Sequence, residues 1–178
     1  MFSFRIRAVI VIFCLLAPLF WVIFDSDGQR TLDLLFLRIK GNPNIELHLG
    51  KLTPTVSEAE MRQVIPKLKL TCLEQESEFG QRVCRGDIAG FNGLPAQHAH
   101  LYYTNDRLTA LKINYQRHYH PALIKQLKVF FGDPESIQNG QHEVLRWTGQ
   151  NSITLMPGPT LEADEEPAML WLGVIPPT

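Results

Sequence analysis

The residues of this sequence best suited to chemistry are its histidines. Four of the six stand in two pairs with His-x-His spacing: His98 with His100, and His118 with His120. Alternate residues of a β-strand share one face, so each pair would present two imidazoles to a zinc or copper ion. Neither pair has a clear third ligand. We therefore predict no metal and no cofactor, and we keep a histidine-based metal-binding or enzymatic domain as the alternative.

The spacing along the chain also separates the two pairs. A hairpin that turns at Asn105-Asp106 would place His98 opposite Ile113. His118 then lies about five residues farther along, or about 16 Å at the rise of a strand. A single site built from all four histidines is therefore disfavoured.

Sequence signatures of catalysis are absent from the chain. It has no G-x-S-x-G nucleophile elbow and no glycine-rich phosphate-binding loop. His142-Glu143 is followed by Val-Leu-Arg, which does not complete the H-E-x-x-H zinc motif. The lack of a C-x-x-C motif argues against a thiol oxidoreductase. We predict no catalytic residue and expect that the protein is not an enzyme.

Two of the three cysteines have the spacing of a cross-strand disulfide. Cys72 and Cys84 lie in two strand-like runs, Leu68–Glu74 and Gln81–Ala89, around a polar turn. If the turn centres on Glu78, the two cysteines face each other, and opposed antiparallel positions can meet disulfide geometry. Closing a loop of that size is worth on the order of 3 kcal/mol. The alternative is two separate buried thiols.

Residues 8–24 form an uncharged apolar run, with Arg5 and Arg7 before it and Asp25 and Asp27 after it. A helix of that length spans about 25 Å, which is enough to cross a bilayer with help from flanking residues. The preceding arginines favour a cytoplasmic amino end. We divide the chain into a cytoplasmic stub at 1–7, a transmembrane anchor at 8–24, a juxtamembrane segment at 25–52 and an exported domain at 53–178. A cleaved signal is the alternative, although no small-x-small cleavage pattern follows the run.

Composition limits the classes of partner. Hydrophobic residues make up 45% and charged residues 20% of the chain, as in a folded globular protein. The net charge is −1, and the lysines and arginines are scattered, so no basic patch indicates nucleic-acid binding. A short anchor, a small exported domain and a cysteine pair fit the bacterial inner membrane, with the carboxyl-terminal domain in the periplasm.

Local signals predict two helices ahead of the first long strands. Residues 31–41 carry apolar side chains at helical spacing (Leu32, Leu35, Phe36 and Ile39) and would lie against the membrane, a partner or their own domain. Ser57–Pro66 reads as a helix with a capping box formed by Ser57 and Glu60. Between them, Ile45, Leu47 and Leu49 alternate with polar residues, which is typical of a short strand.

The clearest hairpin joins His98–Thr104 to Arg107–Gln116. In the register set by the Asn105-Asp106 turn, one face of this hairpin would hold six side chains: His98, His100, Tyr102, Leu111, Ile113 and Tyr115. Aromatic and amphipathic groups favour interfaces, so His98, His100, Tyr102 and Tyr115 make a candidate recognition surface. The same face is equally suited to be the one that the helices cover.

The remaining pattern completes an α+β fold. A helix begins at His120-Pro121 and ends at Gly132, with five apolar residues expected in its buried face: Leu123, Ile124, Leu127, Phe130 and Phe131. Three strands follow: Glu143–Thr148, Ser152–Met156 and Ala168–Val174. The order is helix then strands, twice, so we expect an antiparallel sheet with the helices packed on one face.

One loose motif in this pattern resembles a known group of proteins. The run L-x-x-F-F-G-D-P, followed by a strand that carries Trp147, resembles the BamE-like and β-lactamase-inhibitor-protein-like domains of bacterial envelopes. The resemblance covers about residues 55–175. It implies a non-enzymatic domain that binds other proteins, and no binding residue is carried over from it. The sequence therefore predicts a membrane-anchored protein whose exported domain binds or scaffolds a protein partner.

Overall fold

The computed structural model describes residues 14, 16–17, 26–39, 41–140, 142–162 and 166–174. The predicted cytoplasmic stub and, apart from Cys14, Leu16 and Ala17, the predicted anchor at 8–24 lie outside the described residues. Among the helices that are described, none has the length and apolar character needed to cross a membrane.

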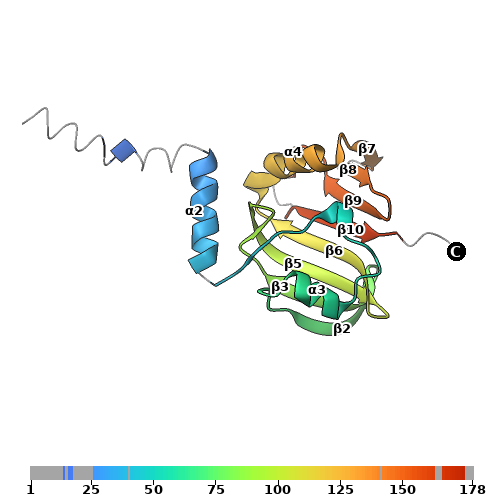
Figure 1. Cartoon of the computed structure of the whole chain (residues 1–178). Coiled ribbons are helices and arrows are strands. Elements are labelled where there is room, and N and C mark those ends of the chain that lie inside the picture. The colour runs from blue at the N-terminus through green and yellow to red at the C-terminus, as the bar shows by residue number, and fades with distance from the viewer. Residues whose placement is uncertain are drawn as a thin grey trace, which may run out of the picture.

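The fold is α+β, and its described elements alternate between helices and groups of strands (Figure 1). The helices are α2 (Ser26–Ile39), α3 (Glu58–Val64) and α4 (His120–Phe131), with short 3-10 turns η1 (Leu49–Lys51) and η2 (Arg117–Tyr119). The strands of the first group are β1 (Asn44–Ile45), β2 (Thr71–Ser77), β3 (Gly80–Asp87), β4 (Gly90–Phe91), β5 (Leu94–Thr104) and β6 (Arg107–Tyr115). Those of the second group are β7 (Glu135–Asn139), β8 (His142–Thr148), β9 (Ser152–Pro157) and β10 (Ala168–Gly173). The expected order of a helix followed by strands, repeated once, is thus present from α3 onward.

One mixed, mostly antiparallel sheet contains all ten of these strands. Its order is β1-β4-β5-β6-β10-β9-β8-β7, and β3 pairs with β5 beside β4 and carries β2 at its outer edge. Only β1 and β4 run parallel among the described pairs. Strand β10 pairs with β6, so the last described strand joins the two groups of strands.

Several local predictions are confirmed. Ser57 Oγ accepts a hydrogen bond from the Glu60 amide, and Glu60 Oε2 accepts one from the Ser57 amide at 2.8 Å, which completes the capping box of α3. Asn105 and Asp106 have φ angles of 50° and 57°, as a two-residue turn with both centres in the left-handed region requires. Cys72 and Cys84 are directly opposed in β2 and β3 and form a disulfide.

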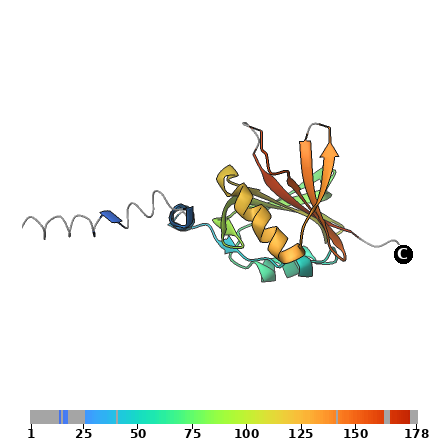
Figure 2. The ribbon, with the colours of Figure 1, turned by 90° about the horizontal axis from the view of Figure 1, so that it is seen from above.

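The core lies on one face of the sheet, under α3 and α4. Directly opposed residues form a row across this face: Cys72, Cys84, Leu101, Leu111, Trp171, Thr154 and Trp147. Met61 of α3 and Leu123 of α4 are buried in the same cluster of apolar side chains. The indole of Trp147 also donates to the Gly132 carbonyl at 2.9 Å, which ties β8 to the end of α4. Figure 2 shows α4 lying across one side of the sheet.

Three predictions about elements need correction. The strand expected through Leu49 ends at Ile45, although Ile45, Leu47 and Leu49 all remain buried in the core. Phe130 of α4 is 58% exposed rather than buried, because it lies at the edge of the stripe formed by Leu123, Ile124 and Leu127 and projects beyond it. Strand β7 was not expected at all.

The register of the main hairpin also differs from the prediction. The turn pairs Thr104 with Arg107 as expected, but a bulge follows, and Tyr102 then pairs with Ala110. Consequently His98 faces Asn114 instead of Ile113, and His100 faces Lys112 instead of Leu111. A shift of one residue moves a side chain to the other face of a sheet. Leu111, Ile113 and Tyr115 therefore belong to the covered face, and His98, His100 and Tyr102 to the opposite one.

Candidate functional site

The face of the sheet opposite α3 and α4, here called the open face, carries the predicted recognition residues. Directly opposed residues again form a row, and this one is mainly polar: Arg85, His100, Lys112, Leu170, Leu155, Arg146 and Glu135. Every one of these side chains is exposed or only partly buried. At the far end, Arg146 donates to Glu135 at 2.5 Å. The part nearer β3 is different, because no described carboxylate pairs directly with its two cations, Arg85 and Lys112.

Arg85 and Lys112 lie on either side of His100 in this row. The Arg85 guanidinium donates to the His98 ring at 3.1 Å, and His98 Nδ1 donates to Asp87 Oδ1 at 2.9 Å. The imidazole thus lies between Arg85 and this carboxylate. Within the described part of the chain, Lys112 takes part in no ion pair. Among the residues that the structure describes, the open face therefore holds two cationic side chains, Arg85 and Lys112, without a direct carboxylate partner.

His100 is held in its neutral form by this environment. Burial lowers the pKa of His100, and the charges of Arg85 and Lys112 lower it further. Its Nδ1 is buried and has no hydrogen-bond partner in the described structure. The His98 and His100 rings are 6.3 Å apart between centroids and meet edge to face. His100 thus adds no full positive charge to the open face near neutral pH.

Two hollows lie on the open face beside these polar groups. One, of about 550 Å³, is lined by Leu73, Phe79, Val83, Arg85, His100 and Tyr102 among others. The rings of Phe79 and Tyr102 meet edge to face at 5.3 Å between centroids and form part of its wall. The other, of about 540 Å³, includes Leu155, Leu170, His142 and Glu143. The face therefore combines two hollows of mixed polar and apolar lining with the cationic side chains of Arg85 and Lys112.

The structure separates the histidine pairs, as the spacing predicted, but for a different reason. His120 is buried on the covered side of the sheet, where its Nε2 donates to the Gly158 carbonyl at 2.7 Å. Its Nδ1 lies 2.8 Å from the Tyr115 hydroxyl, which donates to it because Nε2 carries the ring proton. His118 is exposed beside Tyr119. His98 and His100 thus lie on the opposite face from His120, and Tyr115 serves the core rather than a recognition surface.

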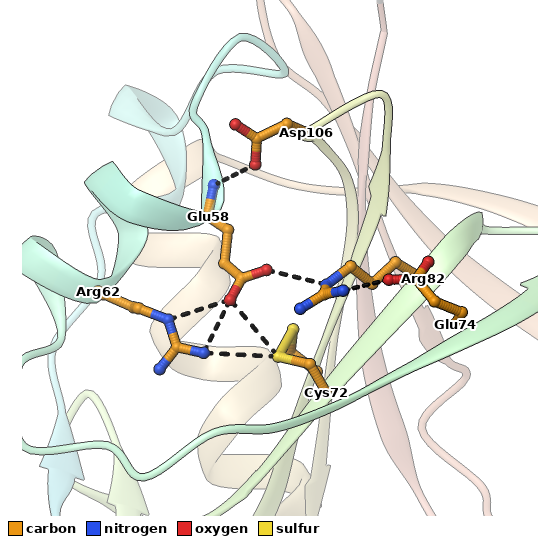
Figure 3. A network of polar contacts seen from close by, with 7 residues as sticks. Glu58, Arg62, Cys72, Glu74, Arg82 and Asp106 are labelled. Atoms are coloured by element: carbon orange, nitrogen blue, oxygen red, sulfur yellow. Dashed lines mark hydrogen bonds and ion pairs between the residues drawn. A yellow bond between two sulfur atoms is a disulfide. The ribbon is translucent and has the colours of Figure 1, made fainter.

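A second polar cluster surrounds the disulfide (Figure 3). Glu58 accepts hydrogen bonds from Arg62 at 2.7 Å and from Arg82 at 3.0 Å, and Arg82 also pairs with Glu74. Burial raises the pKa of Glu58, but the hydrogen bonds and charges of Arg62 and Arg82 outweigh it and lower the pKa overall. The Asp106 carboxylate accepts from the Glu58 amide at 3.2 Å and joins the hairpin turn to the start of α3.

This second cluster is better suited to structure than to metal chemistry. The ligand atoms of Glu58, Cys72 and Cys84 lie within 4.8 Å of one another. Both sulfur atoms are consumed by the disulfide, so neither offers the thiolate that zinc or copper would bind. Its carboxylates and guanidinium groups satisfy one another, unlike the cations of the open face. We interpret it as the clamp that holds β2 and β3 to α3.

A third feature is an apolar groove between the segment 46–51 and α4. It has a volume of about 450 Å³ and is lined by Leu47, Leu49, Leu127, Phe130 and Phe131 among others. Asn92 closes one end, where its side chain bonds both the amide and the carbonyl of Leu47. Nothing in the described structure shows what fills this groove.

No protein-family model matches the chain, and the searches of curated proteins and of solved structures found no significant match. The resemblance of residues 55–175 to BamE-like and β-lactamase-inhibitor-protein-like domains therefore stays a prediction.

Sequence reasoning identified His98, His100 and Tyr102 but missed the two cations beside them. Arg85 and Lys112 come from different strands, and no linear motif links them. The usable signal was the alternation of Lys112 and Asn114 with apolar residues along Arg107–Gln116, which marks a polar face of that strand. Placing that polar face beside the histidines required the bulge that follows the turn.

Proposed function

We propose that this protein is a membrane-anchored binding or scaffolding protein whose exported domain holds a protein partner on the open face. The partner we infer presents carboxylates to Arg85 and Lys112 and apolar side chains to the hollow beside Phe79, Val83 and Tyr102. Residues 8–24 would anchor the chain in a bacterial inner membrane, with the domain in the periplasm. The disulfide is a weak support for this location, because such bonds persist mainly in oxidising compartments.

The observation that carries the proposal is that Arg85 and Lys112 have no direct carboxylate partner among the residues that the structure describes. The described domain pairs its other clustered arginines closely: Arg62 and Arg82 with Glu58, and Arg146 with Glu135. On the open face, in contrast, Lys112 lies opposite His100 and forms no ion pair with a described carboxylate. Charged groups at an interface fix register and increase the rate of association, and apolar hollows supply the desolvated contacts.

The test is site-specific photo-crosslinking in membranes that contain the full chain. A photoreactive phenylalanine analogue replaces Tyr102 in one version and Val129 in the other. Val129 is the matched control, since it is 78% exposed and lies on α4, away from the open face. We expect a discrete protein adduct from position 102 and none from position 129.

A charge reversal then ties the adduct to the proposed chemistry. R85E/K112E should lower the yield of the adduct by about tenfold or more, because two attractions become repulsions. Far-UV circular dichroism and thermal unfolding of the variant should match the parent protein. An adduct that survives the reversal, equal adducts from both positions, or no adduct at all would each contradict the proposal.

A further inference from the structure

Helix α2 has an apolar face that no described part of the domain covers. Leu35, Phe36 and Ile39 are 51%, 63% and 72% exposed. Their spacing places them on one stripe of the helix, together with the partly buried Leu32. Scattered exposed apolar residues are ordinary, but a continuous stripe on one helix indicates a binding surface.

The opposite side of α2 is already fixed to the domain. The Tyr119 hydroxyl donates to Asp33 Oδ2 at 2.7 Å, and burial together with this hydrogen bond raises the pKa of Tyr119. Leu34 packs so closely on Gly90 that a Cβ added to that glycine would lie 2.8 Å from Leu34 Cδ2. The helix therefore cannot turn its exposed stripe toward the domain without losing both contacts. In Figure 1, α2 stands beside the domain with one side free.

We propose that this exposed stripe of α2 lies in the interfacial layer of a lipid bilayer. The inference rests on the proposed anchor at 8–24. That apolar run ends at Phe24, and α2 begins at Ser26, so the helix starts next to the point where the anchor would leave the hydrocarbon. A helix of this length extends about 21 Å, and an amphipathic helix in such a place lies along the membrane surface with its apolar side inserted.

This arrangement has a consequence for the open face. Since α2 is joined to the domain through Asp33–Tyr119 and through Leu34 at Gly90, insertion of its outer stripe orients the whole domain against the bilayer. The partner-binding surface is then presented at a set angle rather than on a free tether. The anchor alone, without α2, leaves the direction of the open face undefined.

The experiment uses the full chain, reconstituted in phosphatidylcholine–phosphatidylglycerol vesicles. Cys14 is first replaced by Ser, and the Cys72–Cys84 disulfide is kept oxidised. An environment-sensitive fluorophore is attached at F36C in one version and at V129C in the matched control. Lipids brominated in the upper acyl chain serve as the quencher. We expect quenching at position 36 to exceed that at position 129 by at least threefold.

The other outcomes separate a failure of the inference about α2 from a failure of the proposed anchor. Extraction with alkaline carbonate tests the anchor separately, because it removes proteins that do not span the bilayer. If the protein stays in the vesicles after this wash but position 36 is not quenched, the inference about α2 fails and the anchor stands. Shielding of position 36 from aqueous iodide without lipid quenching assigns the stripe to a protein instead, which also overturns the proposal. Equal quenching at both positions refutes a contact specific to α2. If carbonate extracts the protein, the anchor fails, and the inference that rests on it falls too.

Discussion

The two faces of the sheet are built from alternating residues of the same strands, yet they have opposite properties. On the covered face, Leu101, Leu111 and Trp171 are fully buried under the helices. One position away in the same strands, His100, Lys112 and Leu170 remain partly exposed. The difference shows how a sheet with helices on one side separates stability from recognition by the period of two in its side chains.

The histidines make the same contrast at the level of one residue type. His120, on the covered side, has both ring nitrogens in hydrogen bonds, to Tyr115 and to Gly158. His100, on the open face, has a buried Nδ1 without a partner and cations on both sides. The first is part of the packing, and the second lies among the polar side chains of the open face. Three variants with matched controls test this division.

The largest difference in stability is expected between alanine variants of two leucines, Leu111 of β6 on the covered face and Leu155 of β9 on the open face. L111A removes a fully buried side chain from the covered face and should lower the free energy of unfolding by roughly 2–5 kcal/mol. L155A makes the same chemical change on the open face, where the side chain is only partly buried, and should cost less than half as much. Urea unfolding of the full chain in mild detergent measures both. Equal losses would show that the open face is also covered.

Removal of the disulfide, which lies at one end of the covered row, should give the second largest loss of stability. C72A/C84A should lower the free energy of unfolding by about 3 kcal/mol, because the loop between the two strands is no longer closed in the unfolded chain. L73A, next to Cys72 but 61% exposed, should change it by no more than about 0.5 kcal/mol.

Thiol chemistry checks the same prediction independently. Labelling of the denatured, unreduced protein should modify one cysteine of the three, Cys14. Reduction of the parent protein should reproduce the urea midpoint of C72A/C84A and leave that of the variant unchanged. Labelling of all three cysteines before reduction would contradict the bond.

The smallest effect is a pH dependence that arises on the open face. The pKa of His100 is lowered by burial and by Arg85 and Lys112, so the unfolded chain binds a proton there more readily than the folded one. Stability from this group is therefore complete above the ordinary histidine pKa of 6.5 and is lost as pH falls from there to the folded pKa. Because His100 is partly exposed, solvent screening keeps the effect modest.

H100Q should remove this part of the pH dependence, and K112Q should raise the pKa of His100 by removing a nearby charge. Proton NMR titration of the His100 ring between pH 4.5 and 8 measures the second change directly. An unchanged His100 pKa in K112Q would mean that the Lys112 charge does not act on the ring. That result would contradict the placement of Lys112 beside His100 on the open face.

Features that depend on neighbouring residues could be predicted from the sequence. The capping box at Ser57 and Glu60, the two-residue turn at Asn105-Asp106 and the opposed cysteines all follow from short-range spacing, and the structure has each of them. The last three strands agree with their predicted bounds to within one residue. The α+β class follows as well, because helix and strand periods differ clearly within each segment.

The division of residues between the two faces was decided only by the tertiary structure. One bulge after the Asn105-Asp106 turn shifts the register by a single residue, and that shift moves Leu111 and Tyr115 to the opposite side from His100. The sequence likewise shows that residues 31–41 are amphipathic but not which side meets the domain, a choice made by Tyr119 and Gly90 from distant elements. Arg85 and Lys112 come together for the same reason: their neighbours are set by strand pairing across the sheet, and the local pattern of either strand carries no record of it.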